Sequence, residues 1–237
     1  MAEVEPERLS WWRTLSAGSF VISCTLIGRL IGILGIGMST GRLDPFAEDA
    51  SQQVDGFLLA TGILGASLTG GLALLLIVRK RSPLRYLALE AWNAKHIALG
   101  VLASLLLVLV FDAARYVTTG SVTPSWLETY RSAASVPMLA IALIVVAPLF
   151  EECLFRGFLQ PGLAASRLQP AGAIFILSIL FMLAHRPTDV LSALEPLASG
   201  MLLGVFRHQT KSTTTGIVMH AFGNLLAIAP MAMILGA

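Results

Sequence analysis

Two adjacent carboxylates and a nearby arginine stand at the end of an apolar run that covers residues 138–150. Glu152 and Arg156 are four residues apart, the spacing at which side chains meet on one helix face, so we expect them to form an ion pair. Glu151 points about 100° away around the same helix. A carboxylate that has no partner in low-dielectric surroundings is suited to accept a proton from water. The segment therefore predicts a general base beside a structural ion pair.

Two later apolar segments carry polar side chains that could work with this base. His185 ends the sequence Phe-Met-Leu-Ala-His, and His220 and Asn224 lie four residues apart, on one helix face. Together with Glu151, these residues could supply a base, its partner and two polarising hydrogen-bond donors. That set is sufficient to activate a water molecule and to stabilise an oxyanion.

Each group also has a purely structural interpretation. The charged cluster at 151–156 could be an ion-pair network between helices, since such networks also hold ionisable groups in apolar surroundings. His185 could cap a helix end or lie at the membrane interface. His220 and Asn224 could serve only as interhelical hydrogen-bonding groups.

In this order, the three motifs resemble those of the CAAX-protease and bacteriocin-processing family, also called the ABI family. The motifs are E-E-x-x-x-R, F-x-x-x-H and H-x-x-x-N, and the resemblance covers about residues 134–230. It implies an all-helical membrane bundle with a catalytic cavity that is open to the cytoplasm. It also implies an intramembrane endopeptidase, as in the enzyme that removes the last three residues of a prenylated CAAX protein.

The same resemblance implies a role for each polar residue. Glu151 and His185 would activate the hydrolytic water, while His220 and Asn224 would hold the oxyanion. The expected ion pair would support the geometry of the site. The substrate would be a protein or peptide in the lipid bilayer, with or without a prenyl group.

A metal-dependent version of this reaction stays open, because Glu151, His185 and His220 form an adequate set of zinc ligands. The chain has no H-E-x-x-H motif, and Asn224 suits an oxyanion donor better than a zinc ligand. We therefore favour a reaction without a metal or any other cofactor.

Two further classes of protein compete with the protease. A non-catalytic membrane scaffold or immunity protein would have no need of the complete set of polar residues. A small transporter that relays protons through Glu151 and His185 would be expected to show inverted repeats, and none is evident.

The composition indicates a membrane protein. Of the 237 residues, 56% are hydrophobic and 13% are charged, and the mean hydropathy is +0.79. Soluble domains carry about 25% charged residues, so the composition excludes a soluble enzyme. The net charge of +2 does not indicate a nucleic-acid partner. Cys24 and Cys153 both lie in apolar runs, so we expect no disulfide.

We expect a single membrane domain over residues 1–237, with variable N-terminal helices over 1–130 and the catalytic core over 134–230. A crossing needs about 20 mostly apolar residues, and seven segments are candidates, with an eighth or re-entrant segment left open. They are 15–38, 57–78, 96–113, 134–157, 171–187, 189–206 and 214–236. We predict continuous helix over about 136–159, because a helix ending at residue 150 would leave Glu151 at the surface, out of reach of His185.

The distribution of Lys and Arg predicts the orientation. The segments between the predicted spans alternate between the two sides of the membrane. Those on the side of the N-terminus hold 11 Lys and Arg residues, and those on the other side hold four. The N-terminus is therefore expected in the cytoplasm, as an uncleaved start to the first helix. The segment 84–95 reads as an amphipathic helix on the cytoplasmic surface. The chain is rich in Ala and Leu, which is typical of a bacterial inner membrane protein.

Overall fold

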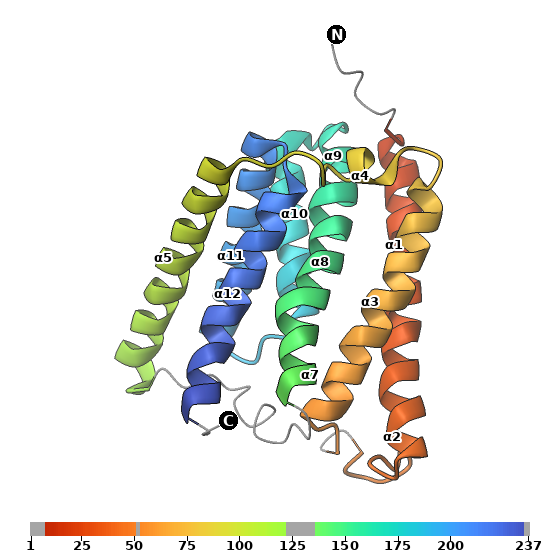
Figure 1. The fold of residues 1–237 in the computed structure, drawn as a ribbon, viewed down its shortest axis with the longest axis vertical. Coiled ribbons are helices and arrows are strands. Elements are labelled where there is room, and N and C mark those ends of the chain that lie inside the picture. Colours follow the sequence, from red (N-terminus) through yellow and green to blue (C-terminus); the bar gives the residue numbers. More distant parts are fainter. Residues whose placement is uncertain (1–7, 51–52, 122–135, 235–237) are drawn as a thin grey trace.

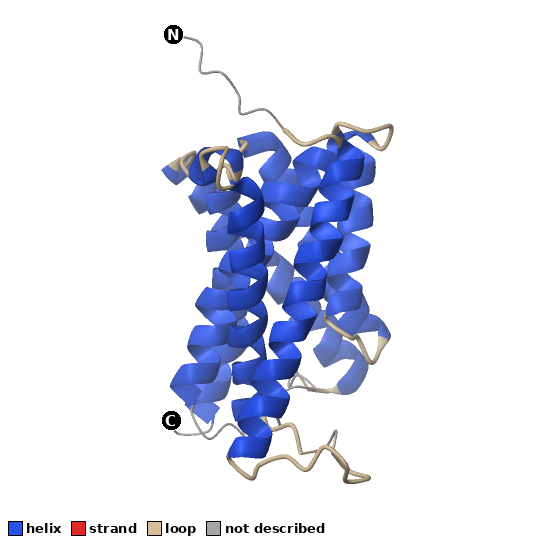
Figure 2. Cartoon of the chain, turned by 90° about the vertical axis from the view of Figure 1, so that its right-hand side faces the viewer, coloured by secondary structure: helices blue, strands red, loops and turns tan. Residues whose placement is uncertain are grey.

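The computed structural model describes residues 8–50, 53–121 and 136–234, with side chains up to residue 228. These residues form helices joined by turns, and they contain no strand (Figure 2). The helices run along a common direction, so that α1 (Trp11–Leu30) begins at one end of the bundle and α12 (Thr213–Ile234) ends at the other (Figure 1). The predicted all-helical class is confirmed.

The first predicted span is one long helix. It continues from α1 through the π-helical turn η1 (Ile31–Gly35) into α2 (Ile36–Ser39). The helices outside the centre of the bundle lie where the other spans were predicted. The exception is α4, which has four residues and corresponds to no predicted span. These helices are α3 (Gly56–Val78), α4 (Pro83–Tyr86), α5 (Ala94–Thr119), α10 (Gln169–Ala184) and α11 (Val190–Thr210).

The central helix is continuous from Val136 to Ala164, as predicted. It has five parts, of which two are π-helical. They are α7 (Val136–Ile141), η2 (Ala142–Val146), α8 (Ala147–Glu152), η3 (Cys153–Leu159) and α9 (Gln160–Ala164). Because the helix does not end at residue 150, both carboxylates lie within the bundle rather than at its surface.

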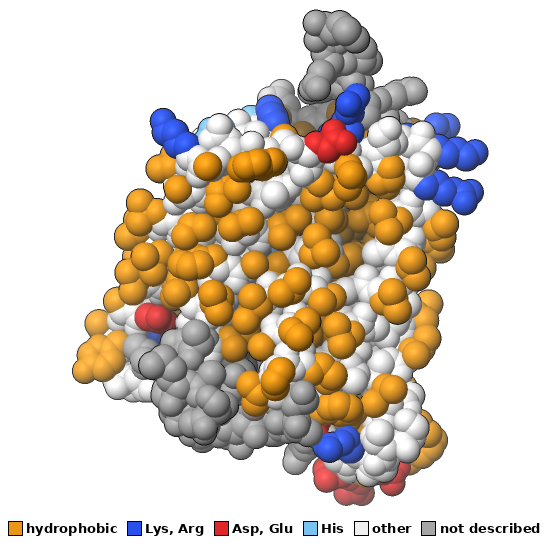
Figure 3. All heavy atoms as spheres, in the orientation of Figure 1, with side chains coloured by type: hydrophobic (Ala, Val, Ile, Leu, Met, Phe, Trp, Pro, Cys, Tyr) orange, Lys and Arg blue, Asp and Glu red, His pale blue; other side chains and the backbone are white. Residues whose placement is uncertain are grey.

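Seven apolar helices fit a protein embedded in a bilayer. Five of the described helices are long and apolar enough to cross a membrane, and α10 and residues 213–228 of α12 are shorter apolar helices. Hydrophobic side chains cover the face shown in Figure 3, whereas charged side chains gather at its two ends. An aqueous protein does not expose so much apolar surface, and the chain is an integral membrane protein.

The predicted amphipathic helix over 84–95 is wrong. Helix α4 ends at Tyr86, and the following residues pack against the start of α12 in an irregular conformation. The carbonyl of Ala88 accepts a hydrogen bond from the Thr213 backbone at 3.0 Å, and the carbonyl of Leu89 accepts one from Thr214 Oγ1 at 2.7 Å. These tertiary hydrogen bonds, together with a left-handed backbone at Ala88 (φ 56°), replace the helical pattern that the hydrophobicity of the segment favoured.

Glycines bring α1 and α3 into backbone contact. A Cβ atom added at Gly28 would lie 2.3 Å from the carbonyl oxygen of Gly65, and one added at Gly65 would lie 2.3 Å from that of Gly28. The hydroxyl of Thr69 donates to the carbonyl of Cys24 across the same contact, at 2.8 Å. Small residues that allow such an approach are a common basis of helix association in membranes.

Candidate active site

The buried ion pair of the site forms within the central helix, as the spacing predicted. Arg156 Nη1 lies 2.9 Å from Glu152 Oε1, and the two side chains are 2% and 0% exposed. Arg156 Nη2 also donates to the carbonyl oxygen of Gly200 in α11, at 3.1 Å. The guanidinium therefore joins the central helix to α11 while it balances the charge of the carboxylate.

His220 of α12 connects this pair to Glu151. Its Nδ1 lies 3.1 Å from Glu152 Oε1, and its Nε2 lies 3.9 Å from Glu151 Oε2. An ionised carboxylate only accepts hydrogen bonds, so the Nδ1 atom of His220 carries the proton in this contact. The Nε2 atom is then directed toward Glu151, whose side chain is 29% exposed.

His185 follows the last residue of α10 and is fixed by its own helix. Its Nδ1 lies 2.8 Å from the carbonyl oxygen of Phe181. A carbonyl can only accept, so Nδ1 carries the proton and the Nε2 atom of neutral His185 keeps its lone pair. Within the described residues, His185 makes no hydrogen bond or ion pair with Glu151.

The ring of Phe181 contacts both histidines and the arginine. Its centroid lies 4.5 Å from that of His185 and 5.6 Å from that of His220, and Arg156 Cζ lies 4.7 Å above the ring. Phe181 is 2% exposed. The first residue of the F-x-x-x-H motif therefore fills the space that these three polar side chains share.

Asn224 has a structural partner that the sequence analysis missed. At η2 the backbone follows a five-residue ladder, because the N–H of Ala147 bonds to the carbonyl of Ala142. The next position of this ladder would pair Pro148 with Leu143, but proline has no N–H. Asn224 Nδ2 donates to the carbonyl oxygen of Leu143 at 2.7 Å instead. A side chain of α12 thus supplies the donor that the proline removes.

Gln160 is a second polar residue that the sequence analysis missed. It is 4% exposed, and its Nε2 donates to the carbonyl oxygen of Gly204 at 2.8 Å. Arg156 bonds to Gly200 in the same manner one turn earlier. The two donors are four residues apart on one helix, and the two acceptors are four residues apart on the other. This equal spacing is the feature of the sequence that could have indicated a contact between Gln160 and α11.

The turns after Glu152 are π-helical and enclosed. The N–H of Gln160 bonds to the carbonyl of Phe155, five residues back, and all seven residues of η3 are buried. π-helical segments inside α-helices are frequent at functional sites. Here the segment carries Arg156 and directly follows the two carboxylates.

The described residues bring Glu151, Glu152, Arg156 and His220 into one connected group. His185 joins this group through Phe181, and Asn224 lies one turn along α12 from His220. Three or more His, Cys, Asp or Glu side chains arranged to hold a metal ion are found nowhere in the described part of the chain. The three ligands of the zinc alternative are therefore not gathered around one point in this arrangement.

One comparison with known proteins finds a similar family. Residues 133–226 match the family model of the type II CAAX prenyl endopeptidase Rce1-like proteins. No curated protein and no solved structure matches the chain. The matched segment contains every polar residue of the site described above, in the order in which the motifs were identified. Through this segment, the chain is similar to the Rce1-like type II CAAX prenyl endopeptidases, which are proteases.

Proposed function

We propose that this protein hydrolyses a peptide bond near the end of a membrane-associated protein, prenylated or not, with a water molecule activated at Glu151. The observation that carries this proposal is the position of Glu151. It is partly exposed, it faces His220 Nε2 at 3.9 Å, and it lies beside a second carboxylate that is already bound to Arg156. Glu152 is buried and bound to Arg156, so Glu151 is the carboxylate that can take part in the reaction.

The reaction follows from the available donors and acceptors. Glu151 takes a proton from water as the water oxygen attacks the scissile carbonyl carbon, and the carbonyl electrons move onto the oxygen. The proton then passes to the leaving nitrogen as the carbon–nitrogen bond breaks. His185 assists as a second acceptor, because its Nε2 lone pair is directed away from its bond to Phe181.

The oxyanion would be held by α12. The imidazole of His220 is oriented by Glu152, and its Nε2 would donate to the oxyanion in the doubly protonated form of the ring. Asn224 has two amide hydrogens and gives one to Leu143, which leaves the other for the oxyanion. Donors that are fixed in advance stabilise developing charge without reorganisation.

The deciding experiment is peptide cleavage by the full-length protein in liposomes. A set of lipidated and unmodified C-terminal peptides would be incubated with wild type, with Glu151→Gln and with Glu48→Gln. The last variant makes the same change at an exposed loop residue. We expect Glu151→Gln to reduce the cleavage rate by about 10²- to 10⁴-fold, the usual contribution of a general base, and Glu48→Gln to leave it unchanged.

Four other outcomes would contradict this proposal. Loss of cleavage with a chelator, restored by Zn²⁺, would favour the zinc-dependent version. Cleavage that survives Glu151→Gln would remove the role of Glu151. No cleavage of any peptide by folded wild type would favour the scaffold or immunity protein, and pH-coupled solute flux would favour the transporter.

The orientation of the protein belongs to the same proposal. An N-terminus in the cytoplasm of a bacterial cell would place the basic end of the bundle on the cytoplasmic side. Cysteines introduced at Lys80 and at Glu48, near opposite ends of α3, would test it by labelling with a reagent that does not cross the membrane. We expect labelling from the outside only at position 48.

A further inference from the structure

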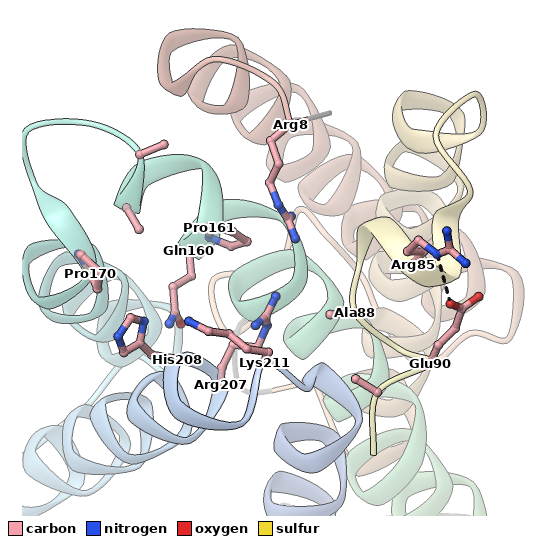
Figure 4. Close-up of a pocket in the computed structure, with 13 residues that line it drawn as sticks. Arg8, Arg85, Ala88, Glu90, Gln160, Pro161, Pro170, Arg207, His208 and Lys211 are labelled. Carbon is pink, nitrogen blue, oxygen red and sulfur yellow. Dashed lines mark ion pairs between the residues drawn. The ribbon is translucent and has the colours of Figure 1, made fainter. Parts of the chain in front are cut away.

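A cavity of about 770 Å³ opens at the end of the bundle where α1 begins, away from the candidate active site. Figure 4 shows side chains from five parts of the chain around it: the segment before α1, α4 with the segment that follows it, helix α9, the start of α10 and the end of α11. Gln160, which lines the cavity, is nine residues beyond Glu151 on the central helix, or roughly 13 Å at the usual helical rise. The cavity is therefore a separate site.

The lining of this cavity is strongly basic. Among the described residues that line it are four Lys or Arg side chains and His208, against one carboxylate. That carboxylate, Glu90, lies 3.5 Å from Arg85 and so offsets one of the four charges. The lining has a net charge of +3 when His208 is neutral. The four Lys or Arg residues are Arg8, Arg85, Arg207 and Lys211.

Two of these cations are held in place before any ligand binds. Arg207 is only 6% exposed. The guanidinium of Arg8 lies over the ring of Tyr86, at 5.0 Å from its centroid, and its Nη1 lies 3.4 Å from the carbonyl oxygen of Gly157. A site whose charges are fixed in advance loses little entropy when it binds an anion.

The cavity lies at the depth of lipid headgroups. Helix α1 begins at Trp11, three residues after Arg8, and Trp11 and Trp12 are 49% and 52% exposed. Exposed tryptophans at the end of an apolar helix mark the membrane interface. Basic pockets between membrane helices at this depth bind the headgroups of anionic lipids, and a cavity of this size is ample for a headgroup.

We propose that this cavity binds the phosphate-bearing headgroup of an anionic phospholipid. Arg8, Arg207 and Lys211 contact the phosphate, and the acyl chains leave the cavity along the apolar surface of the bundle. The negative charge of the phosphate is complementary to the basic lining, and the lipid supplies the apolar part that a soluble phosphate lacks.

The test measures retention of lipid by the purified full-length protein with native mass spectrometry. The probes are phosphatidylglycerol, phosphatidylcholine and inorganic phosphate. We expect wild type to retain phosphatidylglycerol in preference to phosphatidylcholine, and inorganic phosphate at millimolar concentration to leave this retention unchanged. In the double variant Arg8→Gln/Lys211→Gln, the affinity for phosphatidylglycerol should fall roughly 10- to 30-fold, the factor that two Lys/Arg contacts supply.

A matched control removes two charges from the same end of the bundle outside the cavity. The double variant Arg79→Gln/Lys80→Gln changes the exposed residues after α3, which do not line it. We expect it to retain the lipid as wild type does. Because Lys211 is exposed, the single variant Lys211→Gln keeps the test valid if the first double variant does not fold, with a loss of about fivefold expected.

Four results would overturn the proposal. The first two are equal losses of lipid affinity in the two double variants, and no preference of wild type for the anionic lipid. The third is binding of inorganic phosphate without binding of the lipid. The fourth is displacement of the lipid by a peptide with a free C-terminal carboxylate but not by the same peptide as its amide. The last result would assign the cavity to the end of a peptide substrate.

Discussion

The contact between α1 and α3 and the contact between α8 and α12 join helices by different means. At the first, glycine backbones touch, and added Cβ atoms at Gly28 or Gly65 would overlap the opposite carbonyl. At the second, Glu152 meets His220 through a buried hydrogen bond. Lipid tails are as apolar as leucine, so the hydrophobic effect does not drive helix pairing within the bilayer, and packing and hydrogen bonds take its place.

This difference predicts that the two contacts affect different properties of the protein. The glycine contact holds no carboxylate or imidazole, so we expect changes there to affect folding alone. The polar contact holds ionisable groups, of which Glu151 is partly exposed, so changes there should affect both folding and activity. The following substitutions test this division, beginning with the largest expected effect.

Replacing Arg156 by Met should cause the greatest loss of stability. It leaves the Glu152 carboxylate buried without its cationic partner, which costs about 3–5 kcal/mol in comparable cases. The free energy of unfolding in detergent is the measurement. Arg42→Met removes the exposed pair with Asp55 and should cost less than about 1 kcal/mol.

The double variant Glu152→Leu/Arg156→Met should regain most of the stability, because no buried charge is left, yet it should remain inactive. Similar losses of stability for the Arg156 and Arg42 variants would contradict the distinction between buried and exposed pairs.

Replacing Gly28 by Ala should lower the free energy of unfolding by about 1–3 kcal/mol, the usual cost of overpacking. The cleavage rate per folded molecule should not change, because this contact contains none of the carboxylates or histidines of the candidate active site. Gly35→Ala is the matched control on the same long helix, since a Cβ added there meets nothing within 4 Å. A lower cleavage rate in the folded Gly28 variant would show that this contact also affects the active site, which would contradict the distinction between the two contacts.

Asn224 and Pro148 should be energetically coupled. Asn224→Ala removes the donor to the Leu143 carbonyl and should cost about 1 kcal/mol. In a Pro148→Ala background, the backbone N–H of residue 148 can serve that carbonyl, so the same substitution should cost much less. A double-mutant cycle on the free energy of unfolding measures the difference, and strictly additive effects would show that the proline does not create the need for Asn224.

The smallest effect is expected at the start of α11. The side chain of Asp189 accepts a hydrogen bond from the Ser192 backbone at 2.8 Å, and the Ser192 hydroxyl bonds back. The backbone N–H of Ser192 holds the pKa of Asp189 below its usual value. A lowered pKa in the folded state means that the stabilisation is present at neutral pH and is lost as the pH falls below about 4, the value in an unfolded chain.

Asp189→Ala should therefore lower Tm slightly at pH 7, and the difference from wild type should shrink in acid. A difference in Tm that does not depend on pH would show that the carboxylate charge has no part in this cap.

The sequence was sufficient for the parts of the site that depend on one helix. The Glu152–Arg156 pair follows from a four-residue spacing, which any helix turns into a contact. The continuity of the central helix followed from the need to bring Glu151 into the bundle. The helix over 84–95 was predicted wrongly. The start of α12 donates hydrogen bonds to the Ala88 and Leu89 carbonyls, and a hydrophobic pattern does not reveal such bonds between distant segments.

The contacts between helices could not be predicted in the same way. Glu152 and His220 are separated by 68 residues, and Asn224 and Leu143 by 81. No local spacing relates their positions, so neither the partner of Asn224 nor the position of Phe181 between two histidines and an arginine was expected.

The sequence by itself determined that this is a helical membrane protein with three ordered polar motifs, because hydropathy and helical periodicity are properties of local segments. The tertiary structure decided that His220 is bound to Glu152 and faces Glu151, that Asn224 replaces the N–H missing at Pro148, and that five parts of the chain form a basic cavity at one end. These features depend on how distant helices pack against each other, and the packing is fixed only when all of the helices are in place.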